Sequence, residues 1–413
     1  MNPCITIDVS KESSHVQGFW NINKQVSKPK EIEHTKVGFS YINEIFNLIK
    51  EKSNIEPLIF FEYTGVYHLP LMNYLQEQNL KFIPIPPLVA AKVRKSDLRA
   101  KKTDKRDCKS ISYVYYENKL KIYYEPTPEE KYLRELQKHY CQLEDIYQVV
   151  TVHLHELLDT IYPYYKRIFS EFNCYNSLYF LKEYPHPKFV TSHRIQTVAN
   201  KYQQLSNHTA NYYLKFANKL FAYIDEIVPG CNQNDYSVSM FKDLVEQTIF
   251  YKQRLDETIK TICQIISGSD KKELLESIVS IPGVGHNTAA RFIAEIMNID
   301  RFNSHKALIA FTGTDPHIEQ SGDVDGKHLS ITKLGNKRLR KILFQMVRSM
   351  VRKRIPDNHI KDFYKKKTQQ GLKPKVALVA CVNKLLGIIY QLNKTKTRFI
   401  YKDRKSTRLN SSH

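Results

Sequence analysis

The sequence has little glycine, no clustered cysteine and no long uninterrupted apolar run. Its seven cysteines, at positions 4, 108, 141, 174, 231, 263 and 381, form no CxxC pair and no cluster with histidine. This spacing argues against a zinc site and favours reduced thiols in a cytoplasm. With 42% apolar residues, 27 tyrosines and only 13 glycines, the composition is typical of a folded, helix-rich protein rather than a disordered one.

A membrane segment is not expected either. The longest apolar stretch near the C-terminus, VALVACVNKLLGIIY, carries Lys384 and is shorter than a membrane span requires. No signal-peptide pattern opens the chain. We therefore predict a cytoplasmic protein without a membrane partner.

What the chain does have is positive charge. There are 63 Lys and Arg against 42 Asp and Glu, a net charge of +21. A surplus of this size favours a polyanionic partner, and nucleic acid is the best candidate. A merely basic surface remains the alternative.

The elements predicted for residues 1–125 alternate between strand and helix, which predicts an α/β domain. CITIDVS, EPLIFFEYTG and LKFIPIPP have the pattern of buried strands, and SSHVQGFWNINK that of a more exposed hairpin strand. KVGFSYINEIFNLIKEK and VYHLPLMNYLQEQN have helical periodicity.

The rest of the chain is predicted to be helical. Residues 126–268 contain two long amphipathic segments, the first capped by Thr127, and we expect a coiled-coil arm. Residues 269–396 are predicted to form a mostly helical C-terminal domain with a helix-hairpin-helix-like element. Residues 397–413 lack periodicity and are expected to be a disordered or non-native tail.

Four acids of the first domain are candidate metal ligands. Asp8 and Glu62 each stand near the end of an apolar strand, and Asp104 and Asp107 are one helical turn apart. Carboxylates brought together repel one another, and Mg²⁺ or Mn²⁺ relieves that repulsion. Such ions serve phosphodiester chemistry in ribonuclease-H-like nucleases. The alternative for Asp104 and Asp107 is an ordinary mixed-charge helix.

Basic residues surround the second pair of acids. Nine Lys and Arg lie between Lys92 and Lys109, which favours phosphate binding. The candidates are Lys92, Arg94, Lys95, Arg99, Lys101, Lys102, Lys105 and Arg106.

The third domain offers a second set of candidates. Gly283 and Gly285, in SIPGVGHN, suit a phosphate-binding turn, although a plain helical connector has the same pattern. Ser321 stands in a predicted flexible loop ahead of a basic helix, where a serine is able to attack phosphorus. Ser304 and Ser330 are equally eligible by spacing alone. The basic candidates here are Lys333, Lys337, Arg338, Arg340 and Lys341.

Six segments in this order resemble one known family. They are ITIDVSK, FFEYTGVYH, KKTDKRD, IPGVGHNTAARFIAEI, ALIAFTGTDPHIEQSG and ITKLGNKRLRKIL. The set is similar to the DEDD transposases of insertion-sequence family one-ten.

That resemblance implies a RuvC-like domain, a coiled-coil arm and a C-terminal transposase domain. It places the acid tetrad on Asp8, Glu62, Asp104 and Asp107, holding Mg²⁺, and the nucleophile on Ser321. It also implies DNA recombination through a covalent phosphoserine link. It further implies bacterial or archaeal proteins that work at the nucleoid and act as tetramers with composite sites shared between subunits. Some members are guided by a noncoding bridge RNA that pairs with donor and target DNA.

Two other functions remain open. A RuvC-like nuclease acting on branched DNA by hydrolysis would need the four acids but not Ser321. A nucleic-acid-binding protein without enzymatic activity would need neither.

Overall fold

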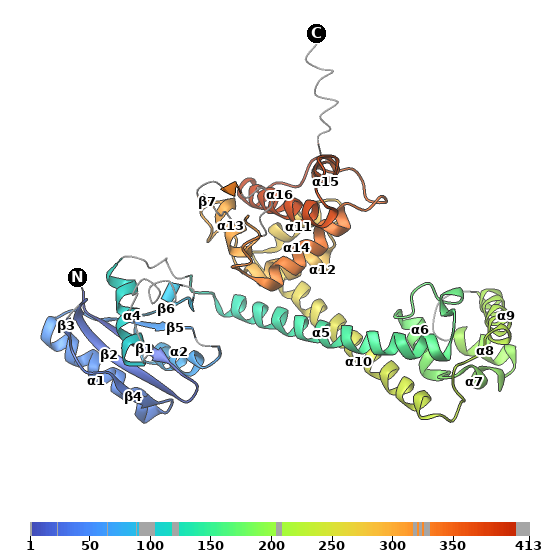
Figure 1. Cartoon of the computed structure of the whole chain (residues 1–413), viewed down its shortest axis with the longest axis horizontal. Coiled ribbons are helices and arrows are strands. Elements are labelled where there is room, and N and C mark those ends of the chain that lie inside the picture. Colours follow the sequence, from blue (N-terminus) through green and yellow to red (C-terminus); the bar gives the residue numbers. More distant parts are fainter. Residues whose placement is uncertain are drawn as a thin grey trace, which may run out of the picture. The chain divides into compact units, whose positions relative to one another are not determined.

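The computed structural model describes residues 2–401 except 23, 64, 88, 91–103, 118–123, 204–208, 317–319, 322–323 and 326–330. Of residues 104–107, 320–321 and 324–325 it describes the backbone alone. The chain divides into two compact units, residues 1–125 and 126–413. The first is α/β and the second is almost entirely helical (Figure 1).

The first unit is built on one mixed sheet with the order β3-β2-β1-β5-β6, in which β4 also pairs with β2. β1 is antiparallel to β2 and parallel to β5, which is parallel to β6. The strands are β1 (Cys4–Val9), β2 (Ser13–Asn21), β3 (Lys24–Gln25), β4 (Lys30–Glu33), β5 (Leu58–Glu62) and β6 (Phe82–Ile85). This mixed order agrees with the predicted α/β domain.

Helices cover both faces of this sheet (Figure 1). Ile5, Ile7 and Val9 pack in one core with α1 (Lys36–Ser53) and α2 (His68–Glu77). Cys4 packs in another core with α4 (Asp104–Tyr116). Because side chains alternate along a strand, Asp8 lies on the same face as Cys4, the one that α4 covers.

Strand β2 differs from its prediction. It was expected to be the exposed strand of a hairpin, yet Val16, Gln17 and Phe19 are buried. The reason is that β3 and β4 both pair with its outer edge, while α4 and α1 lie over its two faces. β2 is therefore an inner strand of the sheet.

Two long helices, α5 (Pro128–Ile161) and α10 (Tyr236–Gly268), pack along each other in the second unit. α5 begins as predicted. The Thr127 hydroxyl accepts a hydrogen bond from the Glu130 backbone N–H, and the Glu130 carboxylate accepts one from the Thr127 N–H. This reciprocal cap stops the helix from fraying at its first turn.

Each long helix contributes to two separate cores. Leu154 and Leu158 of α5 and Phe241 of α10 pack with the helices inserted between the two. Leu133 of α5 and Ile262 of α10 belong to the other core, which contains the glycine turn. The inserted helices are η1 (Tyr165–Arg167), α6 (Tyr175–Glu183), α7 (Pro187–Thr191), α8 (Ile195–Gln203) and α9 (Ala210–Glu226).

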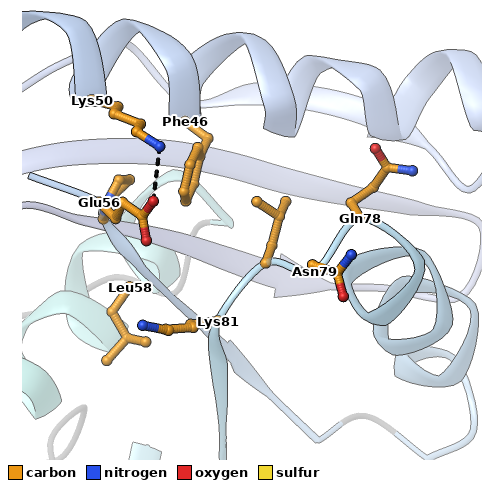
Figure 2. A pocket seen from close by; sticks show the side chains of 9 residues that line it. Phe46, Lys50, Glu56, Leu58, Gln78, Asn79 and Lys81 are labelled. Atoms are coloured by element: carbon orange, nitrogen blue, oxygen red, sulfur yellow. Dashed lines mark hydrogen bonds and ion pairs between the residues drawn. The ribbon is translucent and has the colours of Figure 1, made fainter.

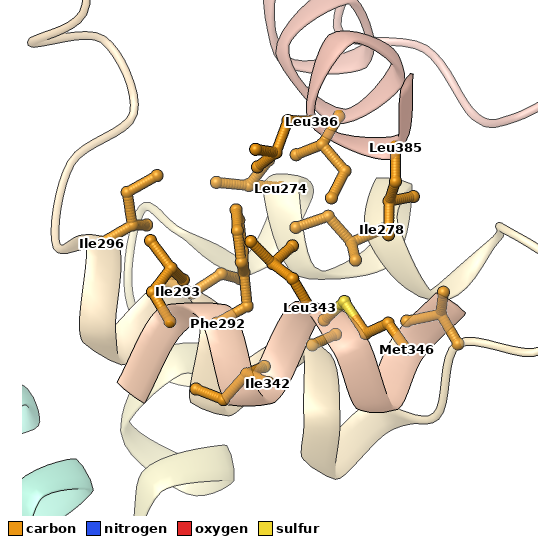
Figure 3. Close-up of a cluster of buried hydrophobic side chains, with 14 of the residues drawn as sticks. Leu274, Ile278, Phe292, Ile293, Ile296, Ile342, Leu343, Met346, Leu385 and Leu386 are labelled. Atoms are coloured by element: carbon orange, nitrogen blue, oxygen red, sulfur yellow. The ribbon is translucent and has the colours of Figure 1, made fainter. Parts of the chain in front are cut away.

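The second of these cores is drawn in Figure 3, where Phe292, Leu343 and Leu386 point toward one another from three helices. Its elements are α11 (Lys272–Val279), α12 (His286–Ile296), α13 (His305–Thr312), α14 (Lys337–Met350), α15 (His359–Gln369) and α16 (Pro374–Thr395). Two short strands, β7 (Gln320–Ser321) and β8 (Val324–Asp325), precede α14.

The length argument against a membrane span was wrong. α16 has 22 residues and is long and apolar enough to cross a membrane by composition. It nevertheless packs inside the protein, because Cys381, Leu385 and Ile389 are completely buried in the core. The apolar composition of α16 is therefore explained by its place in the core.

The expected tail begins later than predicted. Arg398 pairs with Glu276 at 2.9 Å, and the Phe399 N–H donates to the Ser280 hydroxyl at 2.8 Å. Residues 397–401 thus belong to the folded unit, and residues 402–413 lie outside the described part. None of the seven cysteines forms a disulfide.

Candidate functional site

Asp8 and Glu62 stand on neighbouring parallel strands. Ile7 is paired with Phe61, so the two acids occupy the next position along β1 and β5. Phe60 belongs to the core under α4, and alternation places Glu62 on that same face. The structure therefore brings these two predicted ligands to one edge of one sheet face, with Glu62 buried and Asp8 half-buried.

The start of α4 lies beside this edge. The Cys108 thiol donates a hydrogen bond to the His15 carbonyl oxygen at 3.2 Å, and His15 is the partner of Asp8 across the β1–β2 ladder. Asp104 and Asp107 occupy the helical turn just before Cys108. Their side chains lie outside the described part, so the tetrad's geometry stays a prediction.

The sheet face that α4 covers is apolar at one end and acidic at the other. At the far end, burial raises the pKa of the Cys4 thiol to about 12, which keeps the thiol neutral; its hydrogen bond to Tyr116 has a smaller, opposite effect. Four residues on, the same strand carries Asp8. One end is therefore dry and neutral, and the other is acidic.

The donor set at the acidic end fits a hard cation. Carboxylate oxygens on adjacent strands are the ligands that Mg²⁺ and Mn²⁺ prefer. Among the side chains that the structure describes, no group of three or more His, Cys, Asp or Glu is positioned to hold a metal ion. Asp8 and Glu62 make two, and Asp104 and Asp107 on the α4 turn remain the predicted further ligands.

A pocket of about 260 Å³ in the same unit lies elsewhere (Figure 2). It is next to Leu58 and Lys81, at the beginning of β5 and β6, whereas Glu62 ends β5. Lys50 and Glu56 pair across it at 2.8 Å, and this hydrogen bond lowers the pKa of the Glu56 carboxyl. Its charges compensate each other, so it is not a second acidic site.

Ser321 lies in a short hairpin of the second unit. Instead of a flexible loop, the backbone pairs β7 with β8, with Ser321 opposite Val324. An isolated antiparallel bridge between Pro316 and Ile331 closes the base of the segment that contains this hairpin. We name residues 317–330 the serine hairpin.

The base of the serine hairpin is held by hydrogen bonds that the sequence did not reveal. The Thr332 hydroxyl donates to the Asp315 carboxylate at 2.8 Å, and the Thr332 N–H donates to the Asp315 carbonyl at 3.0 Å. One residue on, the Lys333 N–H donates to the Gly313 carbonyl at 3.1 Å. The two ends of the hairpin are therefore fixed to each other.

Close backbone contact adds to this base. A Cβ on Gly335 would meet the Phe311 carbonyl oxygen at 2.5 Å and the Gly313 nitrogen at 2.6 Å, so only glycine fits. The Arg340 guanidinium donates to the Thr312 carbonyl at 2.8 Å. These contacts fix the start of α14 against the end of α13.

A buried carboxylate anchors the same region. Glu295 on α12 is completely buried and accepts from the Asn336 amide at 2.6 Å. Arg338 donates to both of its oxygens, at 3.0 and 3.1 Å. Burial alone would lower the pKa of Arg338, but its bonds to Glu295 outweigh this and raise it.

Several predicted nucleic-acid contacts thus have partners inside the protein. Arg338 is paired with Glu295, and Arg340 caps α13. Lys341 pairs with Glu144 at 3.1 Å and Asp145 at 3.2 Å on α5. The assignment of Arg338, Arg340 and Lys341 to nucleic acid stays a prediction. Lys333 and Lys337, by contrast, have exposed side chains.

The predicted glycine turn has the geometry of a tight connection between α11 and α12. Gly283 has a φ of +88°, and Gly285 is the N-cap of α12 with open space around it. Six predicted cations lie outside the described residues, and only the backbone is described for two more, Lys105 and Arg106. The six are Lys92, Arg94, Lys95, Arg99, Lys101 and Lys102.

The alternative serines have different environments. The Ser304 hydroxyl accepts from the Ala307 N–H at 3.2 Å and caps α13, which gives it a structural role. Ser330 lies outside the described residues. Of the three, Ser321 alone is described within the hairpin.

Comparison with protein families finds two matching models. Residues 5–163 match the transposase family model named DEDD_Tnp_IS110. Residues 275–365 match the model described as "Transposase IS116/IS110/IS902 family". Together the matched segments cover more than half of the chain, including Asp8, Glu62 and Ser321.

Curated relatives are similar over shorter stretches. The pilin gene-inverting protein of Moraxella bovis is 31% identical over 122 residues, which are 30% of this chain and 37% of the relative. The transposase for insertion sequence element IS1111A of Coxiella burnetii is 33% identical over 125 residues, 28% of this chain and 32% of the relative. The chain thus spans about a third of the length of these relatives.

Proposed function

This chain belongs to the IS116/IS110/IS902 family of transposases, and we propose from that premise that it cuts and rejoins DNA as the recombinase of an insertion sequence. The observation that carries the proposal is that Asp8 and Glu62 lie on neighbouring strands at one edge of a sheet. The names of relatives that invert a pilin gene or transpose an element support it.

The acids would act by holding a divalent cation. Asp8 and Glu62, with Asp104 and Asp107 from the α4 turn, would hold Mg²⁺ or Mn²⁺. A cation held there supplies Lewis-acid activation of a phosphodiester and stabilises the departing oxygen. The residues of the protein position the phosphate beside the sheet edge.

Ser321 would make the covalent bond. Its Oγ attacks phosphorus, the bond from phosphorus to one deoxyribose oxygen breaks, and the serine proton is transferred, through water, to that oxygen. The result is a phosphoserine link and a free sugar hydroxyl. Attack by the hydroxyl of another strand reverses the step and frees Ser321, which exchanges strands without an external energy source.

The acids and the serine lie in different units of the chain. We propose that copies of the chain assemble, as a dimer or tetramer, so that each reacting site combines the acids of one subunit with Ser321 of another. Donor and target DNA are the substrates, and a noncoding bridge RNA is the proposed guide. A protein acting on chromosomal DNA is expected in the cytoplasm.

Denaturing gels test the covalent step. Wild-type protein, donor and target DNA, element-derived RNA and Mg²⁺ should give a protein–DNA adduct that disappears with Ser321→Ala. Ser304→Ala is the matched control and should retain the adduct, because Ser304 only caps α13. Strand exchange by Ser321→Ala at the wild-type rate would refute the serine assignment.

Hydrolysis without a covalent step is the second candidate function. It is favoured by one observation: both described acids, and the turn that carries the other two, belong to a single unit. In that case Ser321→Ala would still nick branched DNA in the presence of metal, leave free 5′-phosphates and form no adduct, whereas Asp8→Asn would be inactive.

A further inference from the structure

Positive charge accumulates beyond α14, outside the residues assigned so far. Residues 352–375 contain nine Lys and Arg and only two acids, Asp357 and Asp362. Both acids have partners: Lys361 pairs with Asp357 at 3.2 Å, and the Tyr401 hydroxyl donates to Asp362 at 3.0 Å. Nine cations against two carboxylates leave this segment with a net charge of +7.

Six of these cations define what we name the α15 basic face. All six side chains are exposed, and none has an ion pair among the residues that the structure describes. The members are Arg352, Lys353, Arg354, Lys365, Lys366 and Lys373. Exposed, unpaired cations of one sign produce a local positive field that attracts phosphates.

The α15 basic face is held together by the fold. The Lys361 ammonium donates to the Ile355 carbonyl at 2.8 Å and to the Lys353 carbonyl at 3.4 Å, fixing the turn of Arg352–Arg354 against α15. Lys365 is one helical turn beyond Lys361 on the same side of α15. The Arg352–Arg354 turn and Lys365 of α15 therefore form a short row.

The predicted phosphate-binding turn borders this row. A Cβ on Gly283 would come within 2.8 Å of the Met350 Cα and 3.1 Å of the Ile355 side chain. The glycine turn is thus packed against the segment that leads into Arg352. Backbone and side-chain groups suited to phosphate lie next to each other here.

The row is separated from the serine hairpin by the length of α14. The base of the hairpin contacts Gly335 and Asn336 before the helix, whereas Arg352 follows its end. A helix of 14 residues is about 21 Å long at 1.5 Å per residue. In duplex DNA this distance corresponds to roughly six base pairs.

We propose that the α15 basic face binds the phosphate backbone of duplex DNA flanking the reacting position, roughly six base pairs away from the serine hairpin. The inference rests on the proposed function. The contact is with phosphates, so it strengthens binding and orients the flank without reading its sequence. Duplex DNA is the occupant that family membership favours over RNA.

Binding measurements at several salt concentrations test this proposal. The variant Arg352→Gln/Lys353→Gln/Arg354→Gln should bind a long duplex at least 10-fold more weakly, and its plot of log affinity against log salt should be flatter by about 2 to 3. The control is Lys215→Gln/Lys219→Gln/Lys242→Gln, which removes three exposed lysines near the other core. It should keep the wild-type slope.

A flank series adds a distance test. Wild-type protein should lose affinity when the flank is cut from about 16 to about 4 base pairs, and the Arg352→Gln/Lys353→Gln/Arg354→Gln variant should lose less, since half of the face's cations are gone. Equal losses in both triple variants, or a flank response of the Arg352→Gln/Lys353→Gln/Arg354→Gln variant as large as that of the wild type, would overturn the inference. A larger loss with duplex RNA than with DNA would assign the surface to RNA instead. Failure of the wild-type protein to bind any DNA would instead refute the proposed function.

Discussion

The acidic edge of the sheet and the base of the serine hairpin are built in opposite ways. Asp8 and Glu62 are placed by strand alternation and by the β1–β5 register, which are properties of the backbone. Ser321 is placed by a hairpin whose base depends on contacts from α12, α13 and α14. We therefore expect substitutions at the acids to change activity alone, and substitutions at the hairpin base to change activity and stability together.

The largest effect is expected for Asp8→Asn. It removes a ligand charge, and metal assistance contributes several kcal/mol, so cleavage should fall roughly 10³-fold. The unfolding temperature should change little, because Asn has nearly the same size and shape as Asp. Cleavage rates and thermal melts check this, with the exposed Glu12→Gln as control; a large drop in melting temperature would contradict the comparison.

Glu295→Gln tests the hairpin base most severely. It removes the charge that Arg338 contacts with two hydrogen bonds, and we expect a loss of about 2–3 kcal/mol in unfolding free energy, since Arg338 is partly exposed. Urea unfolding measures it. The exposed pair of Glu276 with Arg398 gives the control Glu276→Gln, for which less than about 1 kcal/mol is expected. Equal losses would mean that Glu295 is no anchor.

Gly335→Ala probes the backbone contact at the same base. The new methyl cannot fit against the Phe311 carbonyl, so the ends of α13 and α14 must separate, at about 1–3 kcal/mol. Adduct formation should fall together with the melting temperature. Gly268→Ala, with open space around its Cβ, should change neither. Full activity in Gly335→Ala would show that the serine hairpin does not depend on this contact.

The smallest effect concerns His186, which belongs to neither predicted site. Burial lowers the pKa of its ring, and the contact of Nε2 with the Cys231 carbonyl oxygen at 3.2 Å only partly opposes this. The unfolded chain binds the proton more readily, so stability should decrease as pH falls below about 6.5. His186→Gln should flatten that dependence in unfolding measured from pH 7.5 to 5. An unchanged slope would exclude His186 as the cause.

Local pattern was sufficient for part of this molecule. The strand ends predicted that Asp8 and Glu62 meet, and Thr127 with Glu130 predicted where α5 begins, because both depend on residues close in sequence. The sequence did not reveal the bond of Thr332 to Asp315 or of Arg338 to Glu295. These partners are 17 and 43 residues apart, and no periodicity links them.

The errors have the same origin. β2 was predicted to be exposed because its own residues look half-polar, but its burial depends on β3, β4 and the helices over it. α16 was taken as too short for a membrane span because its charged ends were left out of the count. Each error concerns the residues that lie beside an element, and a short window of sequence does not contain those residues.

The insertion of α6–α9 between the two long helices has a consequence for synthesis. The partner of α5 is completed about a hundred residues after α5 itself, which at roughly 5–20 residues per second is a delay of roughly 5–20 s. During that interval the apolar side of α5 has no α10 to cover it. A nascent chain of this protein is therefore most exposed to aggregation or chaperone binding while its middle third is being translated.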